Sequence, residues 1–138
     1  GNFWSENDIV KRGFEYINLG FINDVKKLRK IYSLADVFVA PSIQEGFPKT
    51  VAESLLCETP VVYFSNTAVD DVCTHKQTGF AAELFNSKQM AQGIDWVTES
   101  KSRSSELGKN GKSVVQNSFN SNLLCNKYVN LYKKILKK

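Results

Sequence analysis

Short apolar runs that alternate with helix-like segments restrict this chain to a small number of folds. The clearest run, residues 37–40, ends at a Pro-Ser breaker and precedes a segment with helical periodicity that begins at Pro48. Residues 60–64 and 80–82 show the same kind of short apolar run. Uniformly apolar strands are typical of parallel sheets covered on both faces, and strands that alternate with helices indicate right-handed crossovers. The sequence therefore predicts an α/β fold with a Rossmann-like parallel sheet and flanking helices.

Helical periodicity, caps and turn residues divide the rest of the chain. Asp24 is a good N-cap for a helix over residues 25–34, whose apolar residues recur on one face. Residues 98–105 fit either a loop or the start of a helix. We further expect a strand over residues 14–19 and a turn at 20–23. Further helices are expected over residues 5–13, 67–74, from 87 onward and 106–118. The chain should end in an amphipathic helix over residues 121–138.

Length and composition indicate one globular domain. With 138 residues, of which 42% are hydrophobic and 23% charged, the chain is long enough to bury most of one core. No apolar run approaches the roughly 18 residues of a membrane-spanning helix, and no signal-peptide pattern is present. The first residue is Gly rather than Met, so we expect residues 1–138 to be a single, truncated domain of a cytoplasmic protein.

The three cysteines and the lone histidine indicate neither a metal site nor a redox site. Cys57, Cys73 and Cys125 are widely spaced and odd in number, which fits reduced thiols. His75 lies in a polar turn, where a solvated loop residue is expected rather than a ligand or a base. We therefore expect no metal and no cofactor.

Charge is distributed unevenly along the chain. Residues 1–100 carry nine basic and thirteen acidic side chains, whereas residues 101–138 carry nine basic and one acidic. A solvated basic helix face is the commoner cause of such asymmetry, and attraction to an anionic surface is the alternative. In that alternative the lysines after Glu106 hold the chain peripherally at the inner face of an anionic membrane. No nucleic-acid partner is expected.

Residues 45–53 are the strongest candidate for a binding site. They follow the apolar run at 37–40, and ligands of open α/β sheets bind at the carboxyl ends of the strands. If the helix begins at Pro48, the backbone N–H groups of Lys49 and Thr50 point out of its start, where the helix dipole favours an anion such as phosphate. The residues of this helix expected to pack on the sheet are Val51, Ala52, Leu55 and Leu56.

A glycine and two glutamates complete this candidate site. Gly46 allows a ligand to approach the backbone closely because it has no Cβ. Glu53 shares a helix face with Lys49 and lies about 7 Å along the axis from Pro48. An ionised carboxylate at Glu53 suits both ribose hydroxyls of a nucleotide whose diphosphate lies at the helix start, and Glu45 then lies near an attached sugar. The competing interpretation is that a glutamate before a helix only stabilises the helix dipole.

Several motifs occur in the order seen in one known family. They are residues 16–21, residues 34–42, the glutamates at 45 and 53, residues 59–62 and residues 78–80. Over residues 14–135 the chain resembles the C-terminal, donor-binding domain of retaining glycosyltransferases with the GT-B fold, of the family 4 type whose signature is E-x7-E. The resemblance implies a truncated nucleotide-sugar-binding domain, which is the partial C-terminal domain of a GT-B fold.

The resemblance also implies roles for individual residues. Glu45 and Glu53 correspond to the catalytic-site pair, in which Glu53 binds the donor ribose and Glu45 helps to position the donor sugar. The turn that holds the diphosphate and sugar corresponds to Gly46, Phe47, Pro48, Lys49 and Thr50. The turn beside the nucleobase corresponds to Gly20, Phe21 and Ile22. Enzymes of this kind generally need no metal, because cationic side chains and the helix dipole offset the charge of the leaving diphosphate.

The chain departs from the family pattern at several places. Pro48 stands where many members have Gly, and Glu58 stands where a small residue is usual. Residues 67–71 replace a Gly-rich loop that carries a glutamate. The earlier strands of the domain, with the Arg and Lys that neutralise the diphosphate, are not found in the sequence.

These observations imply the donor-binding part of a glycosyltransferase. Such an enzyme transfers a sugar from a UDP- or GDP-type donor to a glycan or lipid-linked acceptor, in polysaccharide or glycoconjugate synthesis. Its acceptor-binding N-terminal domain is expected in the same protein, so the fragment alone should be inactive. The alternative is a non-catalytic nucleotide-binding or interaction module with the same fold, which the departures at Glu58 and Ala68 motivate.

Overall fold

The computed structural model describes residues 15–136 and contains one parallel sheet. Its strands, in the order β1-β2-β3, are β1 (Phe38–Ala40), β2 (Val61–Phe64) and β3 (Gly79–Ala82). Val62 pairs with Val39 on one side and with Phe80 on the other. The helices are α2 (Val25–Leu34), α3 (Lys49–Leu56), α4 (Ser87–Thr98), α5 (Lys101–Ser118) and α6 (Ser121–Leu136), with a 3₁₀ helix, η1 (Ala68–Asp71). The predicted α/β class with a parallel sheet is confirmed.

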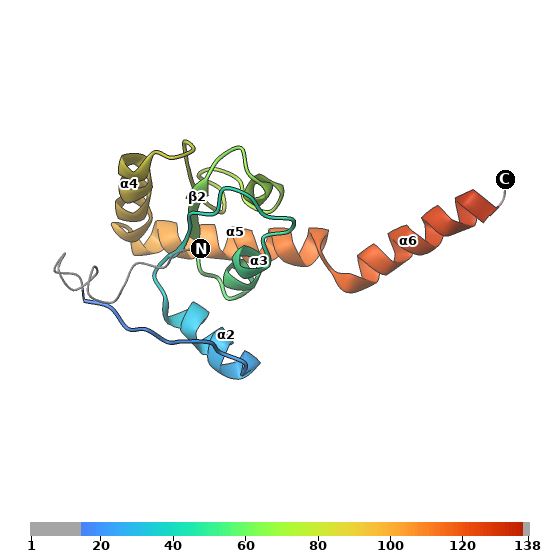
Figure 1. Cartoon of the computed structure of the whole chain (residues 1–138), viewed down its shortest axis with the longest axis horizontal. Coiled ribbons are helices and arrows are strands. Elements are labelled where there is room, and N and C mark those ends of the chain that lie inside the picture. Colours follow the sequence, from blue (N-terminus) through green and yellow to red (C-terminus); the bar gives the residue numbers. More distant parts are fainter. Residues whose placement is uncertain (1–14, 137–138) are drawn as a thin grey trace.

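The central strand β2 forms the middle of the core, because all four of its side chains are buried. Val61 and Tyr63 face one side, where residues of α3 and α5 cover them. Val62 and Phe64 face the other side and pack with residues of α4. Successive side chains of a strand point to opposite faces, so a fully apolar strand needs helices on both sides. Figure 1 shows this layered arrangement.

Side-chain caps determine where several helices begin. Asp24 accepts hydrogen bonds from two backbone N–H groups in the first turn of α2, at 2.8 and 3.3 Å, as predicted. Ser100 caps α5 in the same way at 3.3 Å, so residues 98–105 contain a helix start rather than a loop. Thr67 caps η1, which is shorter than the expected helix over 67–74.

Residues 15–24 form neither a helix nor a strand, so the strand expected over 14–19 is wrong as far as it is described. Most of their apolar side chains stay exposed, with Ile17 at 84% and Phe21 at 90%. A strand needs a neighbour that accepts its hydrogen bonds, and this stretch runs past α2 instead of along β1 (Figure 1). The expected helix over 5–13 lies outside the described residues.

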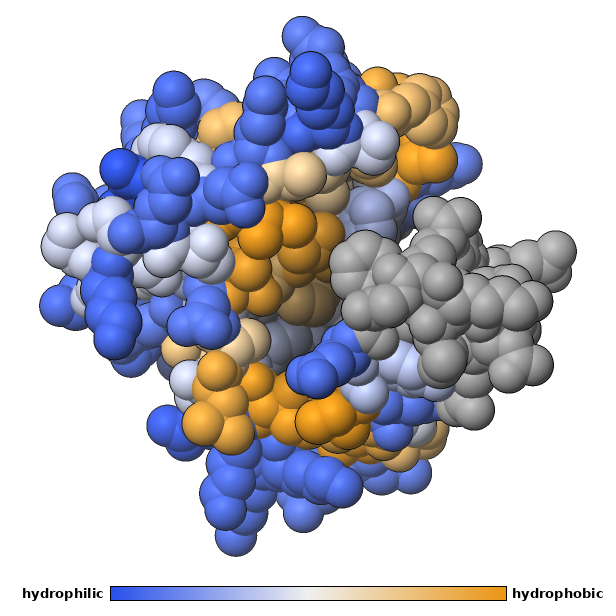
Figure 2. Space-filling view, turned by 90° about the vertical axis from the view of Figure 1, so that its left-hand side faces the viewer, coloured by the Kyte–Doolittle hydropathy of each residue, from blue (hydrophilic) through white to orange (hydrophobic). Residues whose placement is uncertain are grey.

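Within residues 15–136, β1 is consequently an edge strand that pairs with β2 on one side only. Val39 of this strand is 38% exposed, and Ile43 in the loop that follows is 53% exposed. The side of the molecule in Figure 2 has an apolar hollow between hydrophilic lobes. The expectation of a strand covered on both faces therefore holds for β2 and fails in part for β1.

The turn between α3 and β2 explains one departure from the family pattern. Glu58 has a φ of 62°, in the left-handed region that disfavours residues with a Cβ. Gly108 of α5 packs against this turn, since a Cβ there would lie 2.0 Å from the Glu58 carbonyl oxygen. A hydrogen bond from Lys112 Nζ, at 2.6 Å, and the lysine charge lower the pKa of the Glu58 carboxyl. A small residue suits this backbone, and in this chain the Glu58 side chain instead forms an exposed ion pair with Lys112.

The last helix, α6, extends away from the rest of the molecule (Figure 1). It forms where the sequence predicts a helix, but its apolar side chains are exposed. They include Tyr128 at 58%, Leu131 at 49%, Tyr132 at 58% and Ile135 at 59%. Within the described residues this apolar face is therefore not covered by the rest of the chain. In the described part of the chain, no helix is long and apolar enough to cross a membrane.

Candidate functional site

The turn before α3 follows the carboxyl end of β1, as the sequence predicts. Pro48 is the N-cap of α3 rather than its first residue, because its ψ of 71° is not helical. The N–H of Lys49 is already used, since it donates to the Phe47 carbonyl oxygen at 2.8 Å. Among residues 15–136, no group accepts a hydrogen bond from the N–H of Thr50 or Val51. The free N–H groups at the helix start are therefore those of Thr50 and Val51, one residue later than predicted.

Gly46 leaves open space in this turn. A Cβ at Gly46 would meet no atom within 4 Å, whereas at Gly79 and Gly93 it would come within 2.0 and 2.5 Å of neighbouring atoms. Unlike Gly20, Gly46 does not have a positive φ. Its neighbour Glu45 is half-buried and forms no hydrogen bond or ion pair within the described residues. Nothing among residues 15–136 requires a glycine at Gly46, which is consistent with close approach of a ligand.

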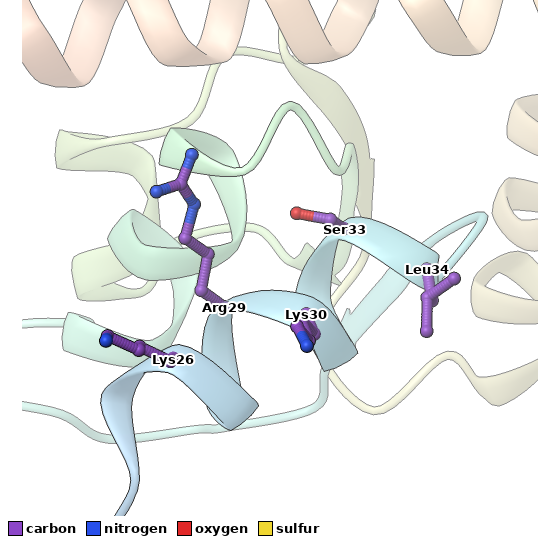
Figure 3. Close-up of a pocket in the computed structure, with 5 residues that line it drawn as sticks. All are labelled: Lys26, Arg29, Lys30, Ser33 and Leu34. Carbon is purple, nitrogen blue, oxygen red and sulfur yellow. The ribbon is translucent and has the colours of Figure 1, made fainter.

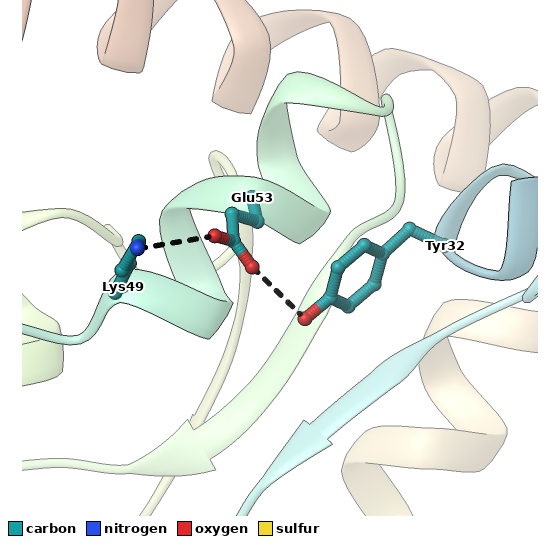
Figure 4. Close-up of polar contacts among 3 residues, drawn as sticks. All are labelled: Tyr32, Lys49 and Glu53. Carbon is teal, nitrogen blue, oxygen red and sulfur yellow. Dashed lines mark hydrogen bonds and ion pairs between the residues drawn. The ribbon is translucent and has the colours of Figure 1, made fainter. Parts of the chain in front are cut away.

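Glu53 lies in the second turn of α3 and has a partner at each carboxylate oxygen (Figure 4). Lys49 Nζ lies 4.0 Å from Oε1, and the Tyr32 hydroxyl donates to Oε2 at 3.4 Å. The Lys49 side chain is 82% exposed, so this ion pair holds the carboxylate only loosely. Burial, followed by the negative charge of Glu53, raises the pKa of Tyr32, which therefore remains a hydrogen-bond donor. The predicted shared face of Lys49 and Glu53 is confirmed.

Two cavities meet at Glu53 and Leu56. One, of about 410 Å³, lies between α2, α3 and α5 and is lined also by Tyr32 and Lys112. The other, of about 400 Å³, lies on the side of Phe119. Both volumes fall in the range of small-ligand sites. Leu56, predicted to pack on the sheet, is 42% exposed because it lies between these cavities.

Cationic side chains of α2 border the same region. Lys26, Arg29 and Lys30 line a further cavity of about 620 Å³ (Figure 3). Arg29 points from α2 toward α3 in Figure 3, and it also lines the cavity at Glu53. Arg29, Lys112 and Tyr32 were not identified as site residues from the sequence. Their helical spacing indicates only a basic face or a buried face, and no local signal places them beside Glu53.

The structure does not bring every expected site residue together. Gly20, Phe21 and Ile22 are not among the residues that line the two cavities at Glu53. Their contact with a nucleobase stays a prediction. His75 is exposed, as expected, although its Nδ1 accepts a hydrogen bond from the Ala81 N–H at 3.0 Å. In the described part of the chain, no group of three or more His, Cys, Asp or Glu side chains could hold a metal ion.

Known structures identify the class of this fold. The C-terminal domain of a group 1 glycosyl transferase (LpcC) from Francisella tularensis aligns with a TM-score of 0.72 and 22% identity, over 83% of this chain and 60% of that chain. Anabaena HepE, solved with UDP-glucose, aligns with a TM-score of 0.80 and 19% identity, over 95% of this chain and 38% of that chain. The fold is that of the C-terminal domain of GT-B glycosyltransferases.

The sequence comparison then identifies the family. Residues 14–114 match the profile described as glycosyl transferases group 1, and the chain belongs to this family. The Staphylococcus aureus capsular polysaccharide biosynthesis glycosyltransferase CapM is 28% identical over 99% of this chain and 37% of its own length. The chain spans about a third of the length of the curated relatives that it matches. The resemblance inferred from the motifs is confirmed.

Proposed function

We propose that this chain is the donor-binding part of a retaining glycosyltransferase, which transfers a sugar from a UDP- or GDP-type donor to a glycan or lipid-linked acceptor. The observation that carries the proposal is the start of α3, where the free N–H groups of Thr50 and Val51 precede a half-exposed Glu53 by less than one turn. Family membership supports it, as does the similarity to CapM, a glycosyltransferase of capsular polysaccharide biosynthesis.

In this proposal the donor lies along α3. Its diphosphate accepts hydrogen bonds at the helix start, where the helix dipole favours negative charge. The turn of Gly46, Phe47, Pro48, Lys49 and Thr50 surrounds the diphosphate and the sugar. Glu53 accepts hydrogen bonds from the ribose hydroxyls, and Glu45 lies toward the donor sugar. Neither glutamate needs to transfer a proton, because stabilisation of the leaving diphosphate charge carries the reaction.

The rest of the machinery belongs, in this proposal, to other parts of a longer protein. An acceptor-binding domain and the cations that offset the diphosphate charge would complete the enzyme, and sugar transfer with retention would follow front-face attack assisted by the leaving phosphate. Arg29 adds positive charge at the Glu53 cavity of this chain, whereas the charge of Lys112 is offset by its ion pair with Glu58. This chain alone is expected to bind a nucleotide weakly and to be inactive.

A titration with nucleotides tests the proposal. UDP and GDP at millimolar concentration should shift the backbone amide NMR signals of Thr50, Val51 and Glu53. In the proposal the first two N–H groups contact the diphosphate, and the side chain of Glu53 contacts the ribose. The nucleosides uridine and guanosine, which lack the diphosphate, should leave the signals of Thr50 and Val51 unchanged. Absence of shifts with both diphosphates would contradict the proposal. A full-length parent that binds donors but transfers no sugar would favour the alternative of a non-catalytic module.

A subsidiary proposal concerns α6 and places the protein in the cytoplasm, peripherally at the inner face of the membrane. Lys127, Lys133 and Lys134 lie on this helix, which has no acidic residue and an exposed apolar face. An interfacial helix buries its apolar face among lipids and is attracted to anionic headgroups through its lysines.

A further inference from the structure

A carboxylate that binds a ribose must be held in one orientation. Glutamate has several side-chain torsions, and fixing them at the moment of binding costs conformational entropy. Lys49 contributes little to this, because its side chain is 82% exposed and lies 4.0 Å from Oε1. The other partner of Glu53 is Tyr32, whose hydroxyl donates to Oε2 at 3.4 Å (Figure 4).

Tyr32 is itself held firmly in the fold. Its side chain is buried, and its ring packs edge-on against Phe38 of β1, with centroids 5.6 Å apart at 81°. Its backbone carbonyl oxygen accepts a buried hydrogen bond of 2.6 Å from Thr59 Oγ1, just before β2. These two contacts join the end of α2 to two strands of the sheet. The Tyr32 hydroxyl is therefore a fixed point beside the Glu53 carboxylate.

The hydrogen bond leaves the carboxylate free to bind a ligand. An ionised carboxylate offers about four lone-pair sites on its two oxygens, and Tyr32 occupies one of them. Glu53 and Tyr32 both line the cavity of about 410 Å³, so the remaining sites are accessible from it. The tyrosine orients the carboxylate without competing for a diol.

We propose that Tyr32 is a positioning residue that holds the Glu53 carboxylate in the orientation that accepts both ribose hydroxyls, and so sets the preference for ribonucleotides over 2′-deoxyribonucleotides. This inference rests on the proposed function of Glu53 as the ribose ligand. Preorganisation of a binding group by a second, rigid side chain strengthens contacts that need fixed geometry. The contact with the 2′-hydroxyl depends on that geometry. Loss of the geometry should therefore weaken the binding of a ribonucleotide more than that of a 2′-deoxyribonucleotide, which lacks this hydroxyl.

The inference is tested by measuring the dissociation constants of UDP and 2′-deoxy-UDP by NMR titration of this chain. If GDP binds more tightly than UDP, GDP and 2′-deoxy-GDP are used instead. Tyr32→Phe keeps the ring against Phe38 and removes only the hydroxyl. The preference for the ribonucleotide is the ratio of the dissociation constant of 2′-deoxy-UDP to that of UDP. We expect Tyr32→Phe to lower this ratio by about five-fold, the size of one modest hydrogen bond. Glu53→Gln should abolish the preference for the ribonucleotide.

Two further tyrosines provide controls. Tyr128→Phe removes an exposed hydroxyl of α6 and should leave both constants unchanged. Tyr63→Phe removes a buried hydroxyl that donates to the Cys73 carbonyl oxygen at 3.1 Å. It should lower the melting temperature without changing the ratio, which separates loss of stability from loss of positioning.

The outcomes distinguish the inference from the proposed function. If Glu53→Gln abolishes the preference and Tyr32→Phe leaves it intact, Glu53 binds ribose and the role of Tyr32 is wrong. If the wild-type chain binds both nucleotides equally, or Glu53→Gln retains the preference, Glu53 is not the ribose ligand and both proposals fail. A reduced ratio in Tyr32→Phe with an unchanged melting temperature supports the inference.

Discussion

The helices α3 and α6 have the same kind of amphipathic sequence and very different surroundings. In α3, Val51 and Leu55 are completely buried against the sheet and α5. In α6, Leu131 and Ile135 are 49% and 59% exposed. Both segments are predicted as helices from their apolar spacing, and both form helices. The difference lies in what covers the apolar face.

An amphipathic pattern predicts that one face of a helix is apolar and packs against something, but it does not identify the packing partner. For α3 the cover follows from topology, because a helix between two neighbouring parallel strands packs on their sheet. For α6 the chain turns away after Phe119, whose ring contacts Phe47 with centroids 5.4 Å apart. Three binding partners suit the exposed apolar face of α6: an anionic membrane, a second copy of the chain and another part of a longer protein.

The largest difference between the core and α6 should appear in thiol reactivity. Burial raises the pKa of the Cys73 thiol to about 12, whereas Cys125 of α6 is exposed. A raised pKa means that the reactive thiolate of Cys73 forms only as the pH approaches that value. At pH 8 we expect iodoacetamide to modify Cys125 at least about 1,000 times faster than Cys73, as measured by mass spectrometry of peptides.

Denaturant provides the control, because both thiols should then react at similar rates. Equal rates in the native chain would mean that the core around Cys73 opens readily, which contradicts its burial. Protection of Cys125 that increases with protein concentration would show that a second copy covers α6.

A matched pair of leucines tests the comparison through stability. Leu55→Ala should lower the free energy of unfolding by about 3 kcal/mol, because it leaves a cavity in a packed core. A Cβ at Gly111 would already lie 2.4 Å from Leu55 Cδ2, which shows how closely α5 packs there. Leu131→Ala, on the exposed face of α6, should change it by less than about 0.5 kcal/mol. Urea denaturation measures both, and equal losses would mean that α6 packs as tightly as α3.

Local patterns predicted most of the fold. The strand β2 is apolar throughout because both of its faces are buried, and Asp24 and Ser100 cap helices through contacts within three residues. The expected strand over 14–19 failed because pairing depends on a distant edge that local sequence does not specify. Likewise, the left-handed backbone of Glu58 belongs to the turn that ends α3, where the N–H groups of Glu58 and Thr59 donate to the Leu55 and Ser54 carbonyl oxygens. The residue type gives no sign of this turn, because glycine rather than glutamate is usual at that position.

The candidate site was predicted in part. The Lys49 and Glu53 pair follows from helical spacing, so its geometry was visible in the sequence. The position of Pro48 differed by one residue, because a proline fits both the N-cap and the first helical position. Tyr32 was identified only as an apolar residue of α2, although its hydroxyl contacts Glu53 across 21 residues of sequence. Contacts of that kind depend on how two helices pack and not on either segment alone.

The smallest expected effect concerns the membrane alternative for α6. At 3.6 residues per turn, Lys133 and Lys134 lie on opposite sides of the apolar face, where their long side chains can reach lipid headgroups. If α6 binds an anionic membrane, replacing both lysines with Gln should weaken binding to phosphatidylserine-containing vesicles by about 30-fold, at about 1 kcal/mol for each lysine. Co-sedimentation measures this, and binding should also fall as salt is added.

The exposed lysines of α2 supply the matched control, because Lys26 and Lys30 lie on a basic face outside α6. The double variant Lys26→Gln/Lys30→Gln should bind vesicles as the wild type does. An equal loss in both double variants would mean attraction by net charge alone, without docking of α6. Absent or salt-insensitive binding would exclude an anionic membrane as the partner of α6. The remaining partners would be another part of a longer protein or a second copy of the chain, and the concentration dependence of Cys125 labelling detects the second copy.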